Sequence, residues 1–444
     1  MSLFEGQQVE LTIEKPASGG RMIARHLGQI VLVRGAIPGE RVLAWIERAE
    51  KRMAYGVTRE VLEPSPDRRP AGDDPLCGGA LYSHIAYARQ LAIKSDVIRD
   101  AFGRLARYPI DQAIAVAASP EEGYRMRARF HVQGARAGFY REGTHQLCDA
   151  APTAQLGAGT LAAVARLAAR LDRDARDAVV SITMTENIAA DERAAHLELA
   201  ARARITDDIL ESAAADAQLA GLSAGDEETG RVRVIGLPFV NDPLSAITGD
   251  PRHAATLRRH PASFFQGNRY LIAALVGAVA AAAPDDGEVL DLYAGVGLFS
   301  VALAALGRLE VTAVEGDRVS GADLRENARP HAPRLDAQVA SVEAYVASRA
   351  GGRMSGRAGR HRTPATVVLD PPRTGISKEA AASIIRLAPG RIVYVSCDPP
   401  TLARDARRLL DAGYRLDSLE AFDLFPNTPH VETLATLSRP VANP

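Results

Sequence analysis

Residues 289–300 read VLDLYAGVGLFS, which is the pattern of a buried strand, a glycine turn and the first turn of a helix. Gly295 and Gly297 would let the backbone approach a ligand that a Cβ atom would keep at a distance. A dinucleotide site would carry a third glycine in the pattern GxGxxG, whereas the third position here is Ser300. Glu315 ends the next expected strand, where an acidic side chain can bind ribose hydroxyls. The stretch therefore predicts a nucleoside ligand.

From about residue 251 onward, strand patterns alternate with helical patterns, which is the signature of a doubly wound, Rossmann-like α/β sheet. Such a sheet binds its ligands at the carboxyl ends of its strands. The last two strands are expected to form an antiparallel pair that closes the sheet. The expected strands are Val289–Leu292, Val311–Val314, Thr366–Leu369, Ile392–Val395, Arg415–Ala421 and Val431–Leu437.

The chain before this region divides into two parts. Residues 1–62 contain short alternating strands separated by glycine turns, which indicates a compact β-barrel. Prolines between 64 and 75 mark a linker. Residues 63–250 mix strand and helix patterns, including a helical stretch at 84–107, and are expected to form a central α/β domain. The α/β domain that carries the glycine turn would span 251–444.

Residues 347–363 interrupt the alternation with five arginines and few apolar residues. A basic loop that contacts nucleic acid is one interpretation. A solvated insertion is favoured, because the segment leads into a strand and so lies at the sheet edge opposite the expected ligand site.

Composition and charge exclude several classes of protein. The net charge of −1 provides no global basic field, so any nucleic-acid contact must come from local patches. The longest apolar run, 271–283, is too short to cross a bilayer, so no membrane segment is expected. The ten histidines show no metal-binding spacing, which predicts no metal site. Only three cysteines argue against a disulfide scaffold and for the reducing cytoplasm.

Cys397 ends an expected strand and directly precedes a helix that begins with Asp398 and Pro399. The positive end of a helix dipole favours a thiolate, although the Asp398 carboxylate works against it. The position therefore predicts a poised thiol. The alternative is a small buried side chain without chemistry, which is the commoner role of a cysteine at a strand end.

Two further segments follow strands of the same sheet. Asp370 begins the run Asp-Pro-Pro-Arg after an expected strand, where the two prolines would fix a rigid turn at the ligand edge. A purely structural turn is the alternative. Residues 423–432 join the last two strands and would bring Glu432 to the same edge.

Taken together, these motifs resemble those of the RNA uracil-5-methyltransferase family, and most closely its ribosomal RNA members. Residues 5–62 look like the RNA-binding TRAM barrel of that family. The resemblance then follows in family order through FFQGN at 264–268, DLYAGVG at 291–297, DPPR at 370–373, VSCDP at 395–399 and DLFPNTPHVE at 423–432.

The resemblance implies roles for individual residues. Cys397 would be the nucleophile and Glu432 the general base. The residues expected to contact S-adenosylmethionine are Gln266, Tyr293, Gly295, Glu315 and Asp370. Ribosomal RNA is the favoured substrate over transfer RNA, because transfer-RNA members typically lack the barrel. The enzyme is expected to act as a cytoplasmic monomer.

One departure from the family concerns cysteine. Ribosomal members often bind an iron–sulfur cluster through four cysteines, three of them close together in sequence. This chain keeps only Cys77 and Cys148, with Ala80 at another of the positions. Two thiolates cannot hold a cluster that requires four ligands. The chain is therefore expected to bind no cluster and to use both cysteines in packing.

The implied chemistry is covalent. A thiolate that adds to carbon 6 of uracil makes carbon 5 nucleophilic toward the methyl group, and a base then removes the proton from carbon 5. The target uridine must leave its stack for this to happen. The barrel at 1–62 and the central domain at 63–250 are both expected to bind the RNA, through contacts to its phosphates and loops. Two alternatives remain: an RNA-binding protein with an inactive catalytic domain, which would require loss of Cys397 or Glu432, and an NAD-dependent oxidoreductase, which Ser300 disfavours.

Overall fold

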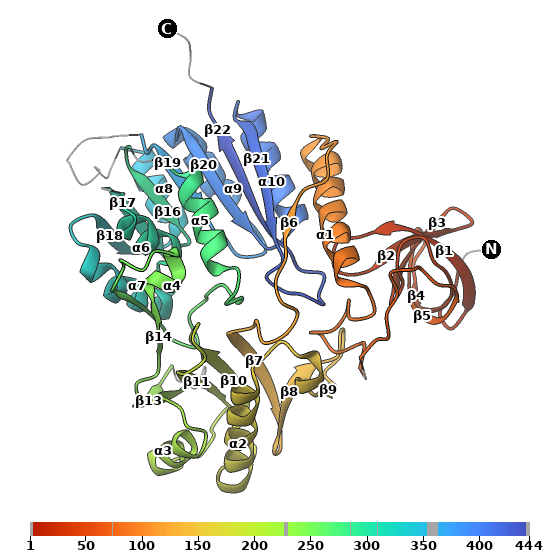
Figure 1. Cartoon of the computed structure of the whole chain (residues 1–444), viewed down its shortest axis with the longest axis horizontal. Helices are drawn as coiled ribbons and strands as arrows, with labels where there is room; N and C mark the ends of the chain where they lie inside the picture. The colour runs from red at the N-terminus through yellow and green to blue at the C-terminus, as the bar shows by residue number, and fades with distance from the viewer. Residues whose placement is uncertain are drawn as a thin grey trace.

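The computed structural model describes residues 3–72, 74–225, 230–284, 286–308, 310–352 and 363–440. In chain order they form a small barrel, a central sheet and a large sheet between helical layers (Figure 1). The expected fold class is confirmed: a Rossmann-like α/β domain preceded by a β-barrel and a mixed α/β region. The boundaries at 62 and 250 stay a prediction. Most of the arginine-rich segment 347–363 lies outside the described residues.

The N-terminal strands close into a barrel in the order β1-β2-β3-β5-β4. Alternate residues of β1, among them Val9, Leu11 and Ile13, are buried inside it, because successive side chains of a strand point to opposite faces. Arg68, in the following linker, donates two 2.6 Å hydrogen bonds to the fully buried Glu40 carboxylate and so holds the linker on the barrel. The strands are β1 (Gln8–Pro16), β2 (Met22–His26), β3 (Gln29–Arg34), β4 (Arg41–Ala49) and β5 (Met53–Glu63).

The central sheet has the order β13-β12-β11-β10-β7-β8-β9. Its apolar face, with Phe130, Ile182 and Leu197, packs against two helices, and its other face carries polar side chains. The elements are β7 (Arg127–Gln133), β8 (Arg136–Tyr140), β9 (Leu147–Cys148), α2 (Ala158–Asp174), β10 (Val179–Glu186), β11 (Arg193–Leu199), α3 (Asp207–Asp216), β12 (Gly221–Gly225) and β13 (Val232–Gly236).

The large sheet has the order β18-β17-β16-β19-β20-β22-β21-β6. The strands from β18 to β20 are parallel, and β22 runs antiparallel to both β20 and β21. Its strands are β6 (Val116–Ala117), β16 (Val289–Leu292), β17 (Val311–Glu315), β18 (Leu335–Val339), β19 (Thr366–Leu369), β20 (Arg391–Ser396), β21 (Arg415–Phe422) and β22 (Glu432–Ser438). The six strands expected from the sequence are confirmed.

Helices cover both faces of the large sheet, which explains why its central strands are mostly apolar. In β16, Val289 faces one apolar core while Leu290 and Leu292 face the other. The first layer contains α4 (Leu244–Thr248), α5 (Ile272–Ala282), α6 (Leu298–Ala305) and α7 (Arg318–Ala328), and the second α8 (Val342–Ala350), α9 (Lys378–Leu387) and α10 (Pro399–Asp411). No helix among the described residues is long and apolar enough to cross a membrane.

Part of the range 63–250 packs on the large sheet rather than on the central one. Helix α1 (Tyr87–Ala101) continues into a π-helical turn, and its residues Ile98 and Phe102 enter the same apolar core as α10. The chain then forms β6, which pairs with the end of β21. An antiparallel pair, β14 (Val240–Pro243) and β15 (Thr256–Arg259), with α4 between them in the chain, leads from the central sheet back to the large one. The chain therefore crosses between the two sheets more than once.

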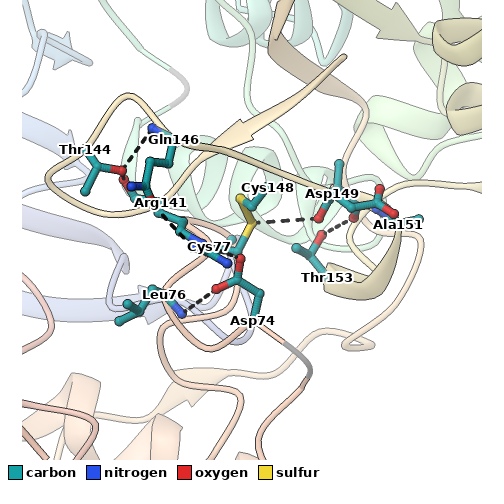
Figure 2. Close-up of a disulfide and its surroundings, with 12 residues drawn as sticks. Asp74, Leu76, Cys77, Arg141, Thr144, Gln146, Cys148, Asp149, Ala151 and Thr153 are labelled. Atoms are coloured by element: carbon teal, nitrogen blue, oxygen red, sulfur yellow. Dashed lines mark hydrogen bonds and ion pairs between the residues drawn. A yellow bond between two sulfur atoms is a disulfide. The ribbon is translucent and has the colours of Figure 1, made fainter. Parts of the chain in front are cut away.

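Cys77 and Cys148 form a disulfide, which corrects the expectation of two unlinked packing residues (Figure 2). β9 pairs with β8 through Phe139 and Cys148, while Cys77 bridges to Arg141 at the end of β8. These pairings bring cysteines 71 positions apart to a Cα–Cα distance of 5.8 Å. Both side chains are buried. A sequence separation of this size gives no sign of such proximity.

We expect a reductant to lower the free energy of unfolding of the oxidised protein by about 2–4 kcal/mol, because reduction releases a loop that the disulfide closes. Urea unfolding with and without dithiothreitol measures this. A Cys77→Ser variant should not respond to the reductant, and Cys397→Ser should respond like the wild type. Equal stability of the wild type in both conditions would contradict the disulfide.

Candidate active site

All seven residues expected from the sequence line one cavity of about 380 Å³. The cavity lies at the carboxyl ends of β16, β17, β19 and β20, where the doubly wound sheet changes direction between β16 and β19. Its volume is within the range of small-molecule sites. The seven are Gln266, Tyr293, Gly295, Glu315, Asp370, Cys397 and Glu432.

The glycine turn after β16 forms one wall of the cavity. The Gly295 N–H donates to the Glu315 carboxylate at 2.7 Å, and the Asp317 N–H donates to the other oxygen at 2.6 Å. These bonds hold Glu315 at the end of β17 beside the turn. Gly297 has a φ of +94°, and a Cβ there would lie 2.8 Å from Leu324 on α7. Gly295 therefore forms the turn beside Glu315, and Gly297 allows α7 to pack closely against it.

Gln266 and Asp370 form a hydrogen-bonded pair in the wall of the cavity. The Gln266 side-chain amide donates to the Asp370 carboxylate at 3.1 Å. Burial raises the pKa of Asp370 to about 7, against the lowering effect of that hydrogen bond, and the Glu315 charge raises it further. Tyr293 presents its ring to the cavity while its hydroxyl donates to Glu343 on α8 at 3.2 Å. The site thus combines aromatic rings with carboxylates.

Cys397 directly follows β20 and lies at the cavity wall with its side chain partly exposed. Asp398 caps α10 by accepting the Thr401 N–H at 2.9 Å, and Pro399 is the first helical residue, as expected. Burial and the nearby Glu432 raise the pKa of the Cys397 thiol to about 11, while Arg373 lowers it. The position before a helix is therefore insufficient to ionise the thiol in the free protein.

Arg373 is the site residue that the sequence analysis left without a role. It lines the cavity with Cys397, whose pKa its charge lowers, and lies 3.3 Å from the His430 ring nitrogens. Burial lowers the pKa of His430 to about 4, and Arg373 lowers it further, so this imidazole is neutral near pH 7. Arg373 therefore places a positive charge beside the thiol. The one feature of the sequence that could have indicated a role for Arg373 is its place in the DPPR run.

Glu432 is the first residue of β22. The antiparallel register pairs Ser396 with Thr433, so the residue after β20 and the residue that begins β22 lie side by side. Glu432 is 2% exposed, and its Oε1 atom has no hydrogen-bond partner within the described part of the chain. Burial, followed by the Asp370 charge, raises its pKa well above the ordinary value. This is an environment in which a carboxylate readily accepts a proton.

The loop between β21 and β22 is held from several sides. The ammonium of Lys94, on α1, lies 2.5 Å from the Asp423 carboxylate, and both side chains are fully buried. Gln90, one turn earlier on α1, donates to the Asn427 side chain and accepts its backbone N–H, both at 2.9 Å. A Cβ on Gly20 of the barrel would lie 3.0 Å from Pro429. Nothing in the sequence pointed to these contacts.

The donor set suits a cationic nucleoside. Glu315, Asp317 and Asp370 present carboxyl groups, which can bind ribose hydroxyls or balance a positive charge. The Asp291 Oδ1 atom beneath the turn is buried without a partner in the described residues. Phe264, Phe265 and Phe425 add apolar walls. The site therefore fits S-adenosylmethionine, which carries a ribose, an adenine and a sulfonium charge.

Comparisons with known proteins agree with this geometry. Residues 231–440 match the family described as tRNA (Uracil-5-)-methyltransferase, and residues 3–58 match the TRAM domain. A 23S rRNA (uracil(1939)-C(5))-methyltransferase of Halomonas elongata is 32% identical and covers 98% of this chain and 90% of its own length. The enzyme of the same name from Alkalilimnicola ehrlichii is 32% identical over 97% of this chain and 96% of its own.

A solved structure shares the whole fold. It is the tRNA (uracil-54, C5)-methyltransferase of Pyrococcus abyssi in complex with S-adenosyl-L-homocysteine, with a TM-score of 0.73 and 24% identity over 96% of this chain and 99% of that one. At this identity the match establishes the fold. The two relatives that match over nearly the full length, with the matched family and the TRAM barrel, show that the chain is an enzyme of the RNA uracil-C5-methyltransferase family.

Proposed function

We propose that this enzyme methylates carbon 5 of a specific uridine in 23S ribosomal RNA, with Cys397 as the nucleophile and Glu432 as the base. The observation that carries the proposal is the common cavity: a free thiol, a buried carboxylate without a hydrogen-bond partner in the described residues and the expected cofactor residues all line it. A transferable methyl group and a flipped base have to meet in one such space.

The cofactor would lie against the glycine turn. Glu315 would accept hydrogen bonds from the ribose hydroxyls, Gly295 would allow close approach of the backbone, and the Tyr293 ring would contact the adenosine. Gln266 and Asp370 would face the charged end of the ligand, because their pair lies between the turn and Cys397 in the cavity wall. When bound, S-adenosylmethionine supplies a methyl group on a positively charged sulfur.

The first step is addition of the Cys397 sulfur to carbon 6 of uracil. The thiol proton passes to water, and Arg373 balances the negative charge on the sulfur. The new bond between sulfur and carbon 6 moves the electron pair of the ring double bond to carbon 5 and the carbonyl oxygen, which makes carbon 5 nucleophilic. Arg373 therefore acts at the moment when the thiolate forms.

The second half requires a base. Once carbon 5 carries both a hydrogen and the new methyl group, the Glu432 carboxylate takes that proton. The electron pair re-forms the ring double bond, and the bond between carbon 6 and sulfur breaks to restore the thiolate. A carboxylate with a raised pKa suits this task, because a raised pKa means a higher affinity for the proton that it removes.

Ribosomal RNA is proposed as the substrate because the two relatives named above are 23S rRNA enzymes. The presence of the barrel distinguishes ribosomal-RNA enzymes from transfer-RNA enzymes less well than expected. The transfer-RNA enzyme of known structure matches 96% of this chain. The proposal places the enzyme in the cytoplasm as a monomer. It includes no iron–sulfur cluster, since Cys77 and Cys148 bond to each other.

We expect Glu432→Gln to accumulate a covalent RNA adduct, because thiol addition and methylation proceed while proton removal is blocked. A denaturing gel with labelled RNA and S-adenosylmethionine measures the adduct. The turnover rate should fall by about 10²–10⁴-fold. The control is Cys397→Ala, with and without Glu432→Gln, which should form no adduct. An adduct in the double variant would show that another residue is the nucleophile.

The thiol can also be tested without RNA, because Cys397 is the one cysteine outside the disulfide. Alkylation by iodoacetamide should rise about tenfold per pH unit toward the thiol pKa of about 11. Arg373→Gln should slow alkylation at a given pH, because the arginine lowers that pKa. Glu432→Gln should speed it, because the carboxylate raises it. Mass spectrometry of the intact protein measures the rates, and the opposite order would contradict the electrostatic assignment.

The RNA substrate is tested in cells. Cells lacking this enzyme should lose 5-methyluridine at one position of 23S ribosomal RNA and keep the modification in transfer RNA. Mass spectrometry of digested RNA fractions measures both. A plasmid copy should restore the modification and a Cys397→Ala copy should not. Loss from the transfer-RNA fraction instead would overturn the choice of substrate.

A further inference from the structure

The polar face of the central sheet is not covered by α2 and α3, which pack on its apolar face. We call the side chains of Arg127, Arg129 and His131 on β7, together with Tyr140 on β8, the open face. The three β7 residues alternate with the buried Ala128 and Phe130, so all three point away from the helices. Residues two apart on a strand are about 6.6 Å apart, so the β7 row extends over about 13 Å.

The open face continues to the catalytic cavity. The Arg127 side chain donates to the Pro261 carbonyl oxygen at 2.7 Å, and the next residue, Ala262, lines the cavity. Just before β7, the guanidinium of Arg125 lies 5.7 Å from the centre of the Phe425 ring, which is part of the cavity wall. A polymer that places one unit in the cavity would therefore pass along β7 with its neighbouring units.

The charge of this region is unbalanced. Within the described part of the chain, the side chains of Arg125 and Arg127 hydrogen-bond carbonyl and amide oxygens and pair with no carboxylate. Burial, and then the charges of Arg125, Arg259 and Arg129, lower the pKa of Arg127 to about 10. Arg129 does pair with Glu198. Arg259 pairs with Asp242, so the guanidiniums without an acid beside them among the described residues are those of Arg125 and Arg127, and such unpaired cations suit an anion such as a phosphate.

Aromatic rings stand at the far end of the row. The rings of His131 and Tyr140 are stacked, with centroids 3.7 Å apart and an interplanar angle of 6°, and His145 contacts Tyr140 edge-on. The register places Gly138 opposite His131, and Tyr140 lies two residues further along β8, on the same face of the strand as Gly138. Burial lowers the pKa of His131, so its ring is neutral near pH 7. Both rings remain partly exposed.

We propose that the open face binds a single-stranded segment of the substrate RNA next to the target uridine, with Arg127 and Arg129 at its phosphates and an unpaired base stacked on the His131–Tyr140 pair. The proposal rests on the function proposed above and adds the place where the flanking RNA binds. A sheet surface with arginines and exposed rings suits unpaired RNA, because every base offers a face for stacking while the phosphates are repeated along the strand.

The test uses the full-length protein and an oligoadenylate RNA, which contains no uracil and therefore does not depend on the catalytic reaction. Tyr140→Ala should weaken binding about tenfold, because loss of one stacked base has an effect of this size. Tyr140→Phe should bind like the wild type. Arg129→Gln should reduce the slope of log affinity against log salt by about 0.7, the value for one phosphate contact on a single strand.

The controls distinguish RNA binding at the open face from an effect of the protein's overall charge and from a loss of folding. Arg173→Gln removes an exposed arginine from α2, on the opposite face of the same sheet, and should leave oligoadenylate binding unchanged. An RNA duplex should bind Tyr140→Ala as tightly as the wild type, because its bases are already stacked. If Tyr140→Ala does not fold, as judged by its thermal midpoint, the salt slope of Arg129→Gln, whose side chain is 53% exposed, decides the question.

Two results would overturn the proposal: wild-type oligoadenylate binding by Tyr140→Ala in its folded form, or an unchanged salt slope in Arg129→Gln. The proposed function is judged separately by the adduct of Glu432→Gln with uridine-containing RNA. If that adduct forms while the open-face variants bind normally, the function stands and the binding surface is wrong. If the variants lose binding and no adduct forms, the surface stands and the chemistry is wrong.

Discussion

The antiparallel pairing of β20 with β22 is the constraint on which the active site depends. Continuing its last pair, Ser396 with Thr433, by one residue sets Cys397 and Glu432 beside each other. Opposed residues of such strands lie about 5 Å apart, so a thiol and a carboxylate can act on one small ring. A slip of one residue would turn Glu432 to the other face of the sheet. The loop before β22 is therefore held by α1, the linker and the barrel, through contacts such as Lys94 with Asp423.

The electrostatics of the cavity follow from burying several acids together. Asp291 and Asp370 have pKa values raised to about 7, mainly by burial, and Glu432 is raised well above its ordinary value. Arg373 lowers the pKa of Glu432, as it does that of Cys397. Without a bound cation, the buried carboxyl groups of this site lack compensating positive charge. A cationic ligand supplies that charge and stabilises their ionised forms. The same burial that keeps the thiol protonated in the free enzyme makes the carboxylate an effective base.

The sheet and the site residues could be predicted from the sequence because their signals are local. Strands buried on both faces are mostly apolar, as in Val289–Leu292 and Thr366–Leu369, and both were located to the residue. The cofactor and catalytic candidates follow directly after strands of a doubly wound sheet, whose carboxyl ends meet at one edge. Arg373 belongs to the DPPR run that the sequence analysis identified. Its role depends on the positions of Cys397 and His430, which lie outside that run.

By itself, the sequence determined the fold class, the nucleoside-type turn, the family resemblance and a set of seven residues that line one cavity. Only the tertiary structure decided that Cys77 and Cys148 bond across 71 positions, that the Cys397 pKa is raised by burial and Glu432, and that α1 and β6 support the large sheet. The physical reason is the distance along the sequence over which each interaction acts. Strand periodicity and helix capping act over a few neighbouring residues, whereas burial, charge coupling and disulfide formation depend on distances that exist only after distant segments have come together.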